Sequence, residues 1–298
     1  QTEGADLLSS FDAFCRYENR TVPRPLEPME QQDKKILLVD DSPETTAFFC
    51  SLLDRAGFAQ VLTLQRGYKG FRGHVLASFG GPQRLLMLGG YTGSGKTLAL
   101  QHLRELGEQT IDLEALASHK GSAFGAIGEA PQPTTEQFEN DLWHALRGLD
   151  ASRPCWLEDE SVMIGRVKIP DAFFARMRSS FLFFAEIPIA ERAEHLVRIY
   201  GAYPKEALAE AIQRIAKRLG PQHCKAALEA LSTGDLRTVA LITLRYYDKA
   251  YENGASSRDQ RLVVRTSGSA SDLRGLAATA IAHARTYLRT AAGAPDPV

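Results

Sequence analysis

The stretch best suited to chemistry is GYTGSGKT, which runs from Gly90 to Thr97. It fits the pattern G-x-x-x-x-G-K-[ST], in which a glycine-rich turn (the P-loop) holds phosphate groups. The glycines let the backbone curl so that several N–H groups point inward, and the following helix adds the positive end of its dipole. Lys96 supplies a mobile positive charge, and the Thr97 hydroxyl is a candidate Mg²⁺ ligand. The predicted phosphate-binding residues are Gly90, Gly93, Ser94, Gly95, Lys96 and Thr97.

Acidic residues follow two of the predicted strands. Asp112 and Glu114 come at the end of the strand predicted over Thr110–Leu113. The cluster Glu158, Asp159, Glu160 and Ser161 follows the strand predicted over Cys155–Leu157. A catalytic base and a metal partner are expected where parallel strands end beside the phosphate turn. We therefore predict Lys96, Glu158 and Glu160 as catalytic residues, together with His119 of the loop described next, and Asp159, with Thr97, as a Mg²⁺ ligand. Asp112 and Glu114 are predicted substrate contacts.

A polar, glycine-rich loop separates these two acidic sites. It reads LASHKGSAFGAIG, Leu116 to Gly128, and is too polar for a buried core segment. Its residues His119, Lys120, Gly121 and Ser122 suit a loop that wraps a second substrate, with His119 and Lys120 facing an anion. An ordinary surface loop has a similar composition, so this alternative stays open.

Strands and helices alternate through the middle of the chain. A strand over Arg84–Leu88 precedes the P-loop, and a helix over residues 96–106 follows it. Further strands are predicted over Cys155–Leu157 and Phe181–Ala185, with helices over 134–148, 171–180 and 190–200. The pattern predicts an α/β fold of the P-loop NTPase type, a parallel sheet with helices on both faces. The predicted parts are a small α/β segment over residues 1–79, a P-loop domain over 80–203 and a helical, basic region over 204–298, which contains a strand RLVVRT and a helix at Leu273–Ala291.

The N-terminal segment holds a second strand-to-helix turn, ILLVDDSPETT. It predicts a strand over Ile36–Val39, a helix over Thr45–Ala56 and another strand over Val61–Leu64. Two acids after a buried strand are also typical of a response-regulator receiver. A receiver needs a third strand ending in Asp, and the chain continues instead with RGYKGFR and the P-loop. We also expect a short helix near Leu7–Cys15.

The charge of the chain is unevenly distributed. Residues 1–165 hold 15 Lys/Arg and 23 Asp/Glu, and residues 166–298 hold 20 and 13. A basic half can attract a polyanion although the whole chain is near neutral. No apolar run is long enough for a transmembrane helix and no signal peptide is evident, so we expect a cytoplasmic protein without membrane contact. The four cysteines lack metal-ligand or redox spacing, which predicts free thiols.

Several blocks in this order resemble the P-loop domain of the tRNA 2-selenouridine synthase family: GGYTGSGKT, IDLEALASHKGSAFG, QPTTEQFEN, WLEDESVMIG and LRYYDKAY. The resemblance implies action on the wobble 2-thiouridine of tRNA. Geranyl diphosphate would alkylate the sulfur, and selenium from selenophosphate would then displace the geranyl group. It also implies that the P-loop holds a diphosphate, that the His119–Gly125 loop and Glu158–Ser161 belong to the active site, and that Arg192 contacts the substrate. The basic half of the chain would then meet the tRNA backbone.

The chain departs from that family in two places. Lys120 stands where the family usually has Arg, which keeps the charge but loses the bidentate fork. The family also carries an N-terminal rhodanese domain whose reactive Cys opens an anion-binding loop. Asp40 stands at that cysteine's place here, followed by an acidic turn. A carboxylate cannot carry a persulfide or selenium. The resemblance thus implies a degenerate, shortened rhodanese-like segment, with selenium exchange lost or dependent on a separate donor protein.

Two other classes of function fit the same motifs. The P-loop accepts ATP as readily as a prenyl diphosphate, so a small-molecule kinase or ATPase is one alternative. A non-catalytic tRNA-binding module with a nucleotide switch is the other. The first predicts ATP turnover without any effect of tRNA, and the second predicts tight, salt-sensitive tRNA binding without modification.

Overall fold

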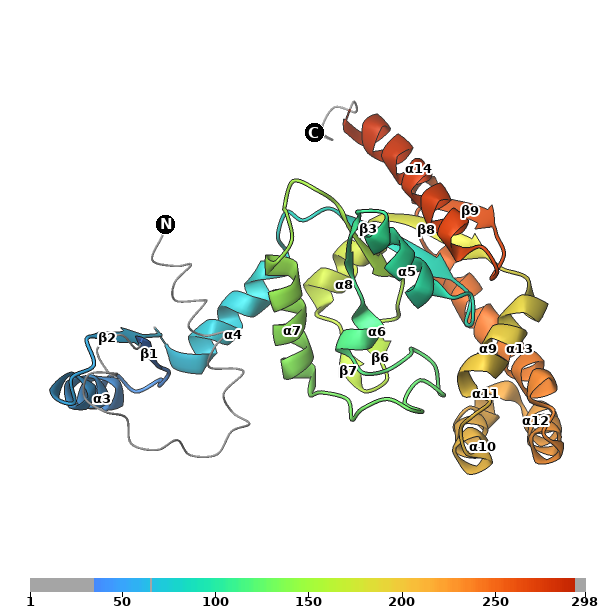
Figure 1. Ribbon diagram of the computed structural model, residues 1–298, viewed down its shortest axis with the longest axis horizontal. Helices are drawn as coiled ribbons and strands as arrows, with labels where there is room; N and C mark the ends of the chain where they lie inside the picture. The colour runs from blue at the N-terminus through green and yellow to red at the C-terminus, as the bar shows by residue number, and fades with distance from the viewer. Residues whose placement is uncertain (1–34, 65, 293–298) are drawn as a thin grey trace. The chain divides into compact units, whose positions relative to one another are not determined.

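The computed structural model describes residues 35–64 and 66–292, and the chain divides into two compact units, residues 1–78 and 79–298 (Figure 1). The helix expected near Leu7–Cys15 lies outside the described residues. Each unit is described by itself below.

The first unit is a parallel strand–helix–strand piece with a following helix, as predicted. Its elements are β1 (Lys35–Leu38), α3 (Pro43–Arg55), β2 (Gln60–Thr63) and α4 (Gly67–Ser78). β1 pairs with β2 in parallel, and Ile36 lies opposite Val61. Helix α3 begins where the Ser42 side chain accepts a hydrogen bond from Thr45 N, with proline in the first turn.

A five-stranded parallel sheet forms the centre of the second unit, which confirms the predicted α/β class. Its strands are β3 (Leu85–Gly90), β4 (Gln109–Ile111), β5 (Cys155–Glu158), β8 (Phe181–Glu186) and β9 (Val263–Ser267). Their spatial order is β4-β5-β3-β8-β9. The P-loop strand β3 is central and buried along its whole length, as expected for a sheet covered on both faces. The carboxyl ends of β5 and β8 therefore lie on either side of the phosphate turn.

Helices pack on this sheet through alternating apolar side chains. Leu86 and Leu88 of β3 share one core cluster with α5 (Lys96–Glu105) and α14 (Leu273–Ala292). α5 and α14 also contact each other (Figure 1). The alternate residues Leu85 and Met87 are equally buried, so a second layer covers the other face, and α8 (Asp171–Arg178) contacts β3.

Smaller elements connect the strands near the site. α6 (Leu113–Leu116) follows β4, and α7 (Thr135–Arg147) precedes β5. An antiparallel hairpin of β6 (Met163–Ile164) and β7 (Val167–Lys168) follows the acidic cluster. This hairpin could not be predicted from the sequence, because two residues per strand are too few to show alternation. Its turn uses Gly165, whose φ is +60°.

The remaining helices form a second core in the same unit. They are α9 (Ile189–Tyr200), α10 (Lys205–Arg214), α11 (Ala216–Leu219), α12 (Pro221–Thr233) and α13 (Leu236–Ser256), followed by the 3₁₀ turn η1 (Gln260–Leu262). Leu208, Ala227 and Val239 are among its buried residues, and Phe124 and Ile127 of the polar loop pack into it. The loop is therefore anchored on the helices rather than free in solvent.

The boundary predicted at 203/204 does not separate compact units. β9 adds to the sheet beside β8, and α14 packs on α5, so both elements belong to the P-loop fold. The predicted strand and helix are present, but local sequence could not show which sheet they join. In the part of the chain that the structure describes, we find no helix with the length and apolar character of a membrane span.

Candidate functional site

The P-loop turn leaves hydrogen-bonding groups uncommitted. Helix α5 begins at Lys96, with Gly95 as a left-handed N-cap and no side-chain cap. The first-turn N–H groups are then left for a ligand, at the positive end of the helix dipole. The Ser94 hydroxyl is buried without a hydrogen-bond partner. Gly93 and Gly95 have φ of +79° and +77°, and a Cβ on Gly95 would come within 2.6 Å of Leu273 Cδ1. Glycine is therefore required there by both backbone and space.

Lys96 lies at the centre of the site. Its Nζ is 3.5 Å from Gly90 O, 3.7 Å from Glu160 Oε1 and 5.0 Å from the centre of the Tyr251 ring. Burial is the largest effect on Lys96 and lowers its pKa, but the carboxyl groups around it, Glu160 among them, outweigh burial and raise the pKa above its ordinary value. The ammonium therefore stays charged. Burial and its surroundings raise the pKa of Tyr251 to about 12, so the phenol stays neutral.

Two buried carboxyl groups, Glu158 and Glu160, and the half-buried Glu114 surround this single ammonium. Glu158, at the end of β5, accepts a hydrogen bond from Leu113 N at 3.0 Å, while its Oε1 has no partner. A Cβ on Gly121 would lie 2.8 Å from Glu114 Oε1 and 2.9 Å from Glu160 Oε2. Both carboxyl groups therefore lie close to the backbone of that glycine. Burial is the main cause that raises the pKa of all three, that of Glu158 well above its usual range and that of Glu160 to about 8.

The Thr97 hydroxyl donates to Glu114 Oε2 at 3.1 Å, so Thr97 and Glu114 are the groups that fit a Mg²⁺ ion. Among the described residues, no group of three or more His, Cys, Asp or Glu side chains is arranged to hold a metal by itself. Such a site suits Mg²⁺, which keeps several waters and takes its other ligands from phosphates.

The prediction that Asp159 shares this metal with Thr97 does not fit the structure. Asp159 forms an ion pair with the buried Arg258, and Arg178 lies 3.7 Å away. Its charge is thus used to fix the end of β5 against the segment before β9. Neither Asp159 nor Arg258 lines the cavity over the P-loop.

His119 organises the polar loop from inside. The ring is buried, and its Nδ1 accepts from Gly121 N at 3.1 Å. A Cβ on Gly125 or Gly165 would come within 2.7 Å of the ring, so two glycines enclose it. Burial lowers the pKa of His119, which agrees with a neutral ring whose Nδ1 is an acceptor. His119 also lines the cavity over the P-loop, so its predicted roles in catalysis and toward an anion stay predictions.

Lys120 and Ser122 also have partners in this loop. Lys120 Nζ forms an ion pair with Glu129 Oε1 at 2.5 Å, so this carboxylate balances its charge. Ser122 Oγ accepts from Phe124 N at 3.1 Å. Tyr247 accepts from Ala123 N at 3.0 Å, and burial is the main cause that raises its pKa to about 12. α13 thus holds the loop in place.

Arg192 lies behind the P-loop rather than in the cavity. Its guanidinium makes two bonds of 2.8 Å to Asp248 and one of 3.1 Å to Thr92 O. Its side chain is buried, supports the turn backbone and does not line the cavity over the P-loop, so this position does not fit the predicted substrate contact. The block LRYYDKAY supplies Tyr247, Asp248 and Tyr251, residues to which the sequence alone assigned no role.

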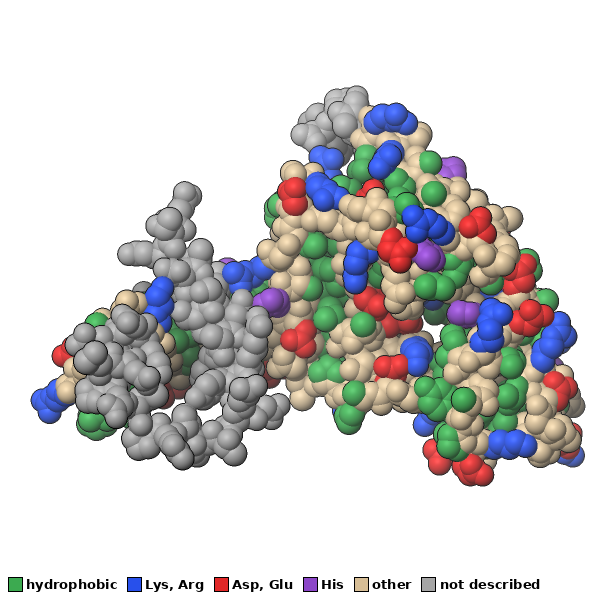
Figure 2. Space-filling view, viewed as in Figure 1, with side chains coloured by type: hydrophobic (Ala, Val, Ile, Leu, Met, Phe, Trp, Pro, Cys, Tyr) green, Lys and Arg blue, Asp and Glu red, His purple; other side chains and the backbone are tan. Residues whose placement is uncertain are grey.

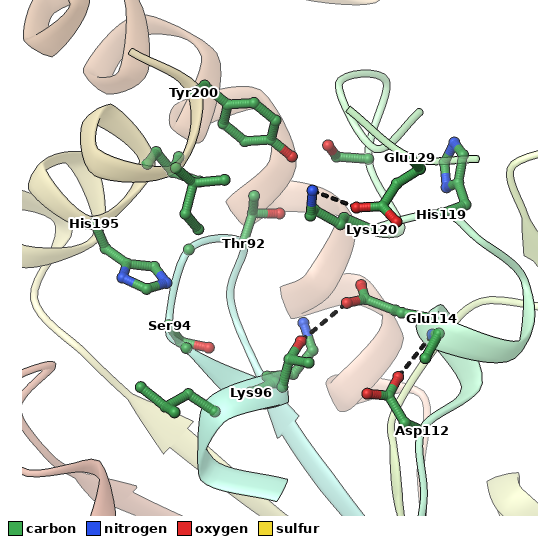
Figure 3. Close-up of a pocket in the computed structure, with 18 of the residues that line it drawn as sticks. Thr92, Ser94, Lys96, Asp112, Glu114, His119, Lys120, Glu129, His195 and Tyr200 are labelled. Atoms are coloured by element: carbon green, nitrogen blue, oxygen red, sulfur yellow. Dashed lines mark hydrogen bonds and ion pairs between the residues drawn. The ribbon is translucent and has the colours of Figure 1, made fainter. Parts of the chain in front are cut away.

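These groups enclose a cavity of about 410 Å³ over the P-loop. Figure 3 shows Lys96, Asp112 and Glu114 on one side, and His195 and Tyr200 projecting from α9 on another. The Asp112 carboxylate caps α6 by accepting from Ala115 N at 2.7 Å. Beside this cavity is a small apolar one of about 50 Å³, lined by residues such as Val197 and Val239. Leu196 and Tyr200 line both, so the charged pocket opens on an apolar wall.

The N-terminal turn around Asp40 has no such open groups. Asp40 Oδ1 accepts from Ser42 N at 2.7 Å, and Asp41 forms an ion pair with Lys69 at 3.0 Å. Among the described residues, Cys50 lies on α3, and Cys155 and Cys224 are buried in the other unit. Burial raises the pKa of Cys155 to about 12, so this thiol is not a nucleophile at neutral pH.

Comparison with known proteins gives consistent matches. A family model described as the tRNA 2-selenouridine synthase AAA domain matches residues 83–282. The chain is 34% identical over 234 residues to a tRNA 2-selenouridine synthase of Shewanella loihica, covering 67% of this chain and 62% of the relative. For the proteins of the same name from Bdellovibrio bacteriovorus and Sulfurovum sp., identities are 39% over 156 residues and 29% over 239. Those matches cover 50% and 69% of this chain, and 40% and 64% of the relatives. The chain thus spans less than two thirds of their length.

Proposed function

The chain belongs to the tRNA 2-selenouridine synthase family, and from that premise we propose that it modifies the wobble 2-thiouridine of tRNA. The reaction we propose is transfer of a prenyl group, of the geranyl type, from a prenyl diphosphate to the sulfur. The P-loop holds the diphosphate of this donor.

We choose a prenyl diphosphate as the donor because of one observation. The uncapped start of α5, with Lys96, lies in the same cavity as apolar side chains of α9. Lys96 and the unpartnered Ser94 hydroxyl offer donors to a diphosphate. Leu196, Ile199 and Tyr200 of α9 offer apolar surface to a hydrocarbon tail. A prenyl diphosphate joins these two chemical characters in one molecule, whereas a nucleotide places polar ribose beyond its phosphates.

The proposed transfer balances as a substitution at carbon. The C–O bond between the prenyl group and the diphosphate breaks, a C–S bond forms, and pyrophosphate leaves. The 2-thiouridine loses its N3 proton, because the alkylated sulfur no longer carries the thiocarbonyl double bond. Lys96 neutralises charge on the leaving group. Glu160, whose pKa is raised to about 8, can take the proton above about pH 8, where its carboxylate is the main form.

A Mg²⁺ ion would be held by Thr97 and Glu114 and would add positive charge beside the diphosphate. Selenium exchange is the part of the family's chemistry that we propose is lost or supplied by a separate donor protein. The Asp40 turn supports this proposal, because it offers carboxylates where a thiolate would be needed.

The direct test incubates the chain with tRNA carrying 2-thiouridine and with geranyl diphosphate, and then measures the nucleoside mass. We expect the gain of one geranyl group, and none with Lys96→Ala. Folded protein that binds geranyl diphosphate but gives no mass gain would contradict the transferase proposal.

A small-molecule kinase or ATPase is the second candidate. The Thr97–Glu114 pair, with Glu158 at the end of the neighbouring strand, also suits a magnesium nucleotide. The two candidates differ in which compound raises the melting temperature, since a ligand that binds only the folded state stabilises it. A shift with ATP and none with geranyl diphosphate would favour the kinase. Salt-sensitive tRNA binding without modification would instead indicate a non-catalytic module.

A further inference from the structure

A second and larger cavity lies against the site and has no role in the function proposed above. Its volume is about 1110 Å³. It shares His119, Ser122 and Tyr251 with the cavity over the P-loop, so the two meet at the polar loop and at Tyr251. We call it the arginine–tyrosine groove, after the lining residues Arg166, Arg178, Arg214, Arg218, Tyr246 and Tyr247. Figure 2 shows a hollow in the second unit between the central body and the helices at the lower right, with charged side chains around it.

Four cations of this groove are exposed and, among the described residues, lack acidic partners, whereas Arg178 pairs with Asp159. Arg166, Arg214, Lys217 and Arg218 are all exposed, and no carboxylate among the described residues forms an ion pair with any of them. Backbone carbonyls hold two of them in place: Arg214 donates to Ala123 O at 2.9 Å, and Arg166 donates to Gln132 O at 2.7 Å. A guanidinium fixed by one N–H keeps the others free for phosphate oxygens.

The groove also contains an aromatic platform. The rings of Tyr246 and Tyr247 lie 4.9 Å apart at 59°. Arg218 donates to the Tyr246 hydroxyl at 3.2 Å, which orients a half-buried ring beside an exposed cation. Aromatic faces beside cations are the surface on which single-stranded nucleic acids stack their bases.

The inner end of the groove has a different character. Glu160, with its raised pKa, and Tyr251 lie there, next to Lys96 of the phosphate site. The polar edge of a base can hydrogen-bond to both side chains, whereas a phosphate group is bound best by the exposed cations farther out in the groove. The charge pattern therefore places phosphates at the outer cations and one base at the inner end.

We propose that the arginine–tyrosine groove binds single-stranded RNA, with phosphates on Arg166, Arg214, Lys217 and Arg218 and one base turned out of its stack toward Glu160 and Tyr251. This inference rests on the function proposed above, and it places the acceptor of that reaction, the 2-thiouridine base, at the inner end of the groove. The donor enters over the P-loop, the RNA enters through the groove, and the reacting atoms meet where the two cavities share Tyr251. A base inside a duplex could not reach that point, so the bound segment must be single-stranded.

The first test is photocrosslinking of the full chain to an RNA stem-loop that carries 4-thiouridine in its loop, followed by peptide mapping. We expect crosslinks in residues 119–132, 161–166, 214–218 or 246–257. Crosslinks confined to α14 or to the first unit would overturn the proposal.

The second test compares matched charge reversals by RNA-binding titration in the absence of prenyl diphosphate. Lys217→Glu/Arg218→Glu should weaken binding about tenfold or more and lower the salt dependence. Arg237→Glu/Arg289→Glu makes the same charge change at exposed residues that do not line the groove, and it should have a much smaller effect. Equal weakening by both pairs would mean that only net charge matters, and would overturn the proposal.

A third comparison isolates stacking. Tyr246→Ala should weaken RNA binding about fivefold or more, whereas Tyr246→Phe keeps the ring and should bind nearly as the wild type does. Melting temperatures of both variants separate this loss from misfolding, because Tyr246 also packs on the helical core. Two failures can be told apart. RNA bound in the groove without modification contradicts only the proposed reaction, and normal modification by the groove variants contradicts only the groove.

Discussion

The corner between β1 and α3 and the corner between β3 and α5 share one backbone plan. In both, a parallel strand ends, the chain turns, and a helix begins within a few residues. In the first corner the Ser42 hydroxyl accepts from Thr45 N, Asp40 accepts from Ser42 N, and Glu44 lies in the first turn. In the P-loop corner no side chain caps the helix, and Ser94 Oγ stays unpartnered.

This difference decides what each helix end can bind. The positive end of a helix attracts anions, and a side chain that caps it satisfies that attraction internally. The first corner is capped by its own side chains, and its carboxylates would repel an anionic ligand. The P-loop corner leaves its donors open, so it gains stability only when an anion arrives. A strand–turn–helix corner therefore becomes a binding site when its caps are left out.

The largest expected effect comes from the glycines that allow each corner. Gly95→Ala should lower the free energy of unfolding of the second unit by about 3 kcal/mol, since the residue has positive φ and the new Cβ would meet Leu273. Gly67→Ala should likewise destabilise the first unit, because its Cβ would lie 2.6 Å from the Asp40 carbonyl carbon. Hydrogen exchange resolved by peptide measures each unit within the full chain.

Gly73→Ala is the control for this pair. Gly73 lies within α4, and nothing approaches its Cβ position within 4 Å. Alanine there should leave stability unchanged or raise it by about 0.5–1 kcal/mol. A Gly95→Ala variant as stable as Gly73→Ala would show that the P-loop turn does not need its left-handed residue.

Next in size is the loss of ligand binding on removal of Lys96. Lys96→Ala should weaken binding of geranyl diphosphate about 100-fold, because a charge-assisted contact to the phosphates is lost. Isothermal titration or the ligand-induced melting shift measures it. Lys69→Ala, at the exposed lysine paired with Asp41 in the first unit, should bind the ligand as the wild type does. Similar losses in both variants would remove the distinction between the corners.

A pH comparison gives a smaller effect. The pKa of Glu160 is raised from 4.5 to about 8, so the folded state keeps a proton that the unfolded state releases. The free energy of unfolding must therefore fall as pH rises from about 4.5 to about 8. Glu160→Gln removes this dependence, so its melting temperature should gain about 3 °C or more on the wild type between about pH 5 and about pH 8.

The exposed Glu44 of the first corner is the control for that measurement. Hydrogen bonds, first from its own backbone and then from Ser42, lower its pKa, so its contribution to stability is lost only as pH falls toward acid. Glu44→Gln should therefore follow the wild type between about pH 5 and about pH 8. A Glu160→Gln variant that does the same would contradict the buried, protonated carboxyl group.

The strand end, turn and helix start of the P-loop segment could be predicted from the sequence because its residues are contiguous. Gly90 to Thr97 form one strand end, one turn and one helix start, so composition and spacing indicate the geometry. The α/β class and the alternating elements could be predicted for the same reason. The place of β9 in the sheet could not, because its pairing with β8 depends on contacts between segments far apart in the chain.

Side-chain roles failed to follow from sequence where a distant partner decides them. From the sequence Asp159 is a candidate metal ligand, but in the structure it pairs with Arg258. Arg192 is likewise a candidate substrate contact, but its guanidinium binds Asp248. Tyr251 could have been noticed, since it follows Tyr247 by four residues on one helix and both then face the site. The burial that raises the pKa of Glu160 could likewise not be predicted from the local sequence around it.

The smallest expected effect comes from two serines in equivalent corners. Ser42→Ala removes a cap and should lower the stability of the first unit by about 1 kcal/mol, with no effect on diphosphate binding. Ser94 caps nothing, so Ser94→Ala should leave stability unchanged and weaken diphosphate binding a few-fold, by about 1 kcal/mol. Hydrogen exchange of α3 and titration with geranyl diphosphate give the two readouts on both variants. If Ser94→Ala instead destabilised α5 and left binding intact, its hydroxyl would be a cap, and the P-loop corner would be as closed as the first.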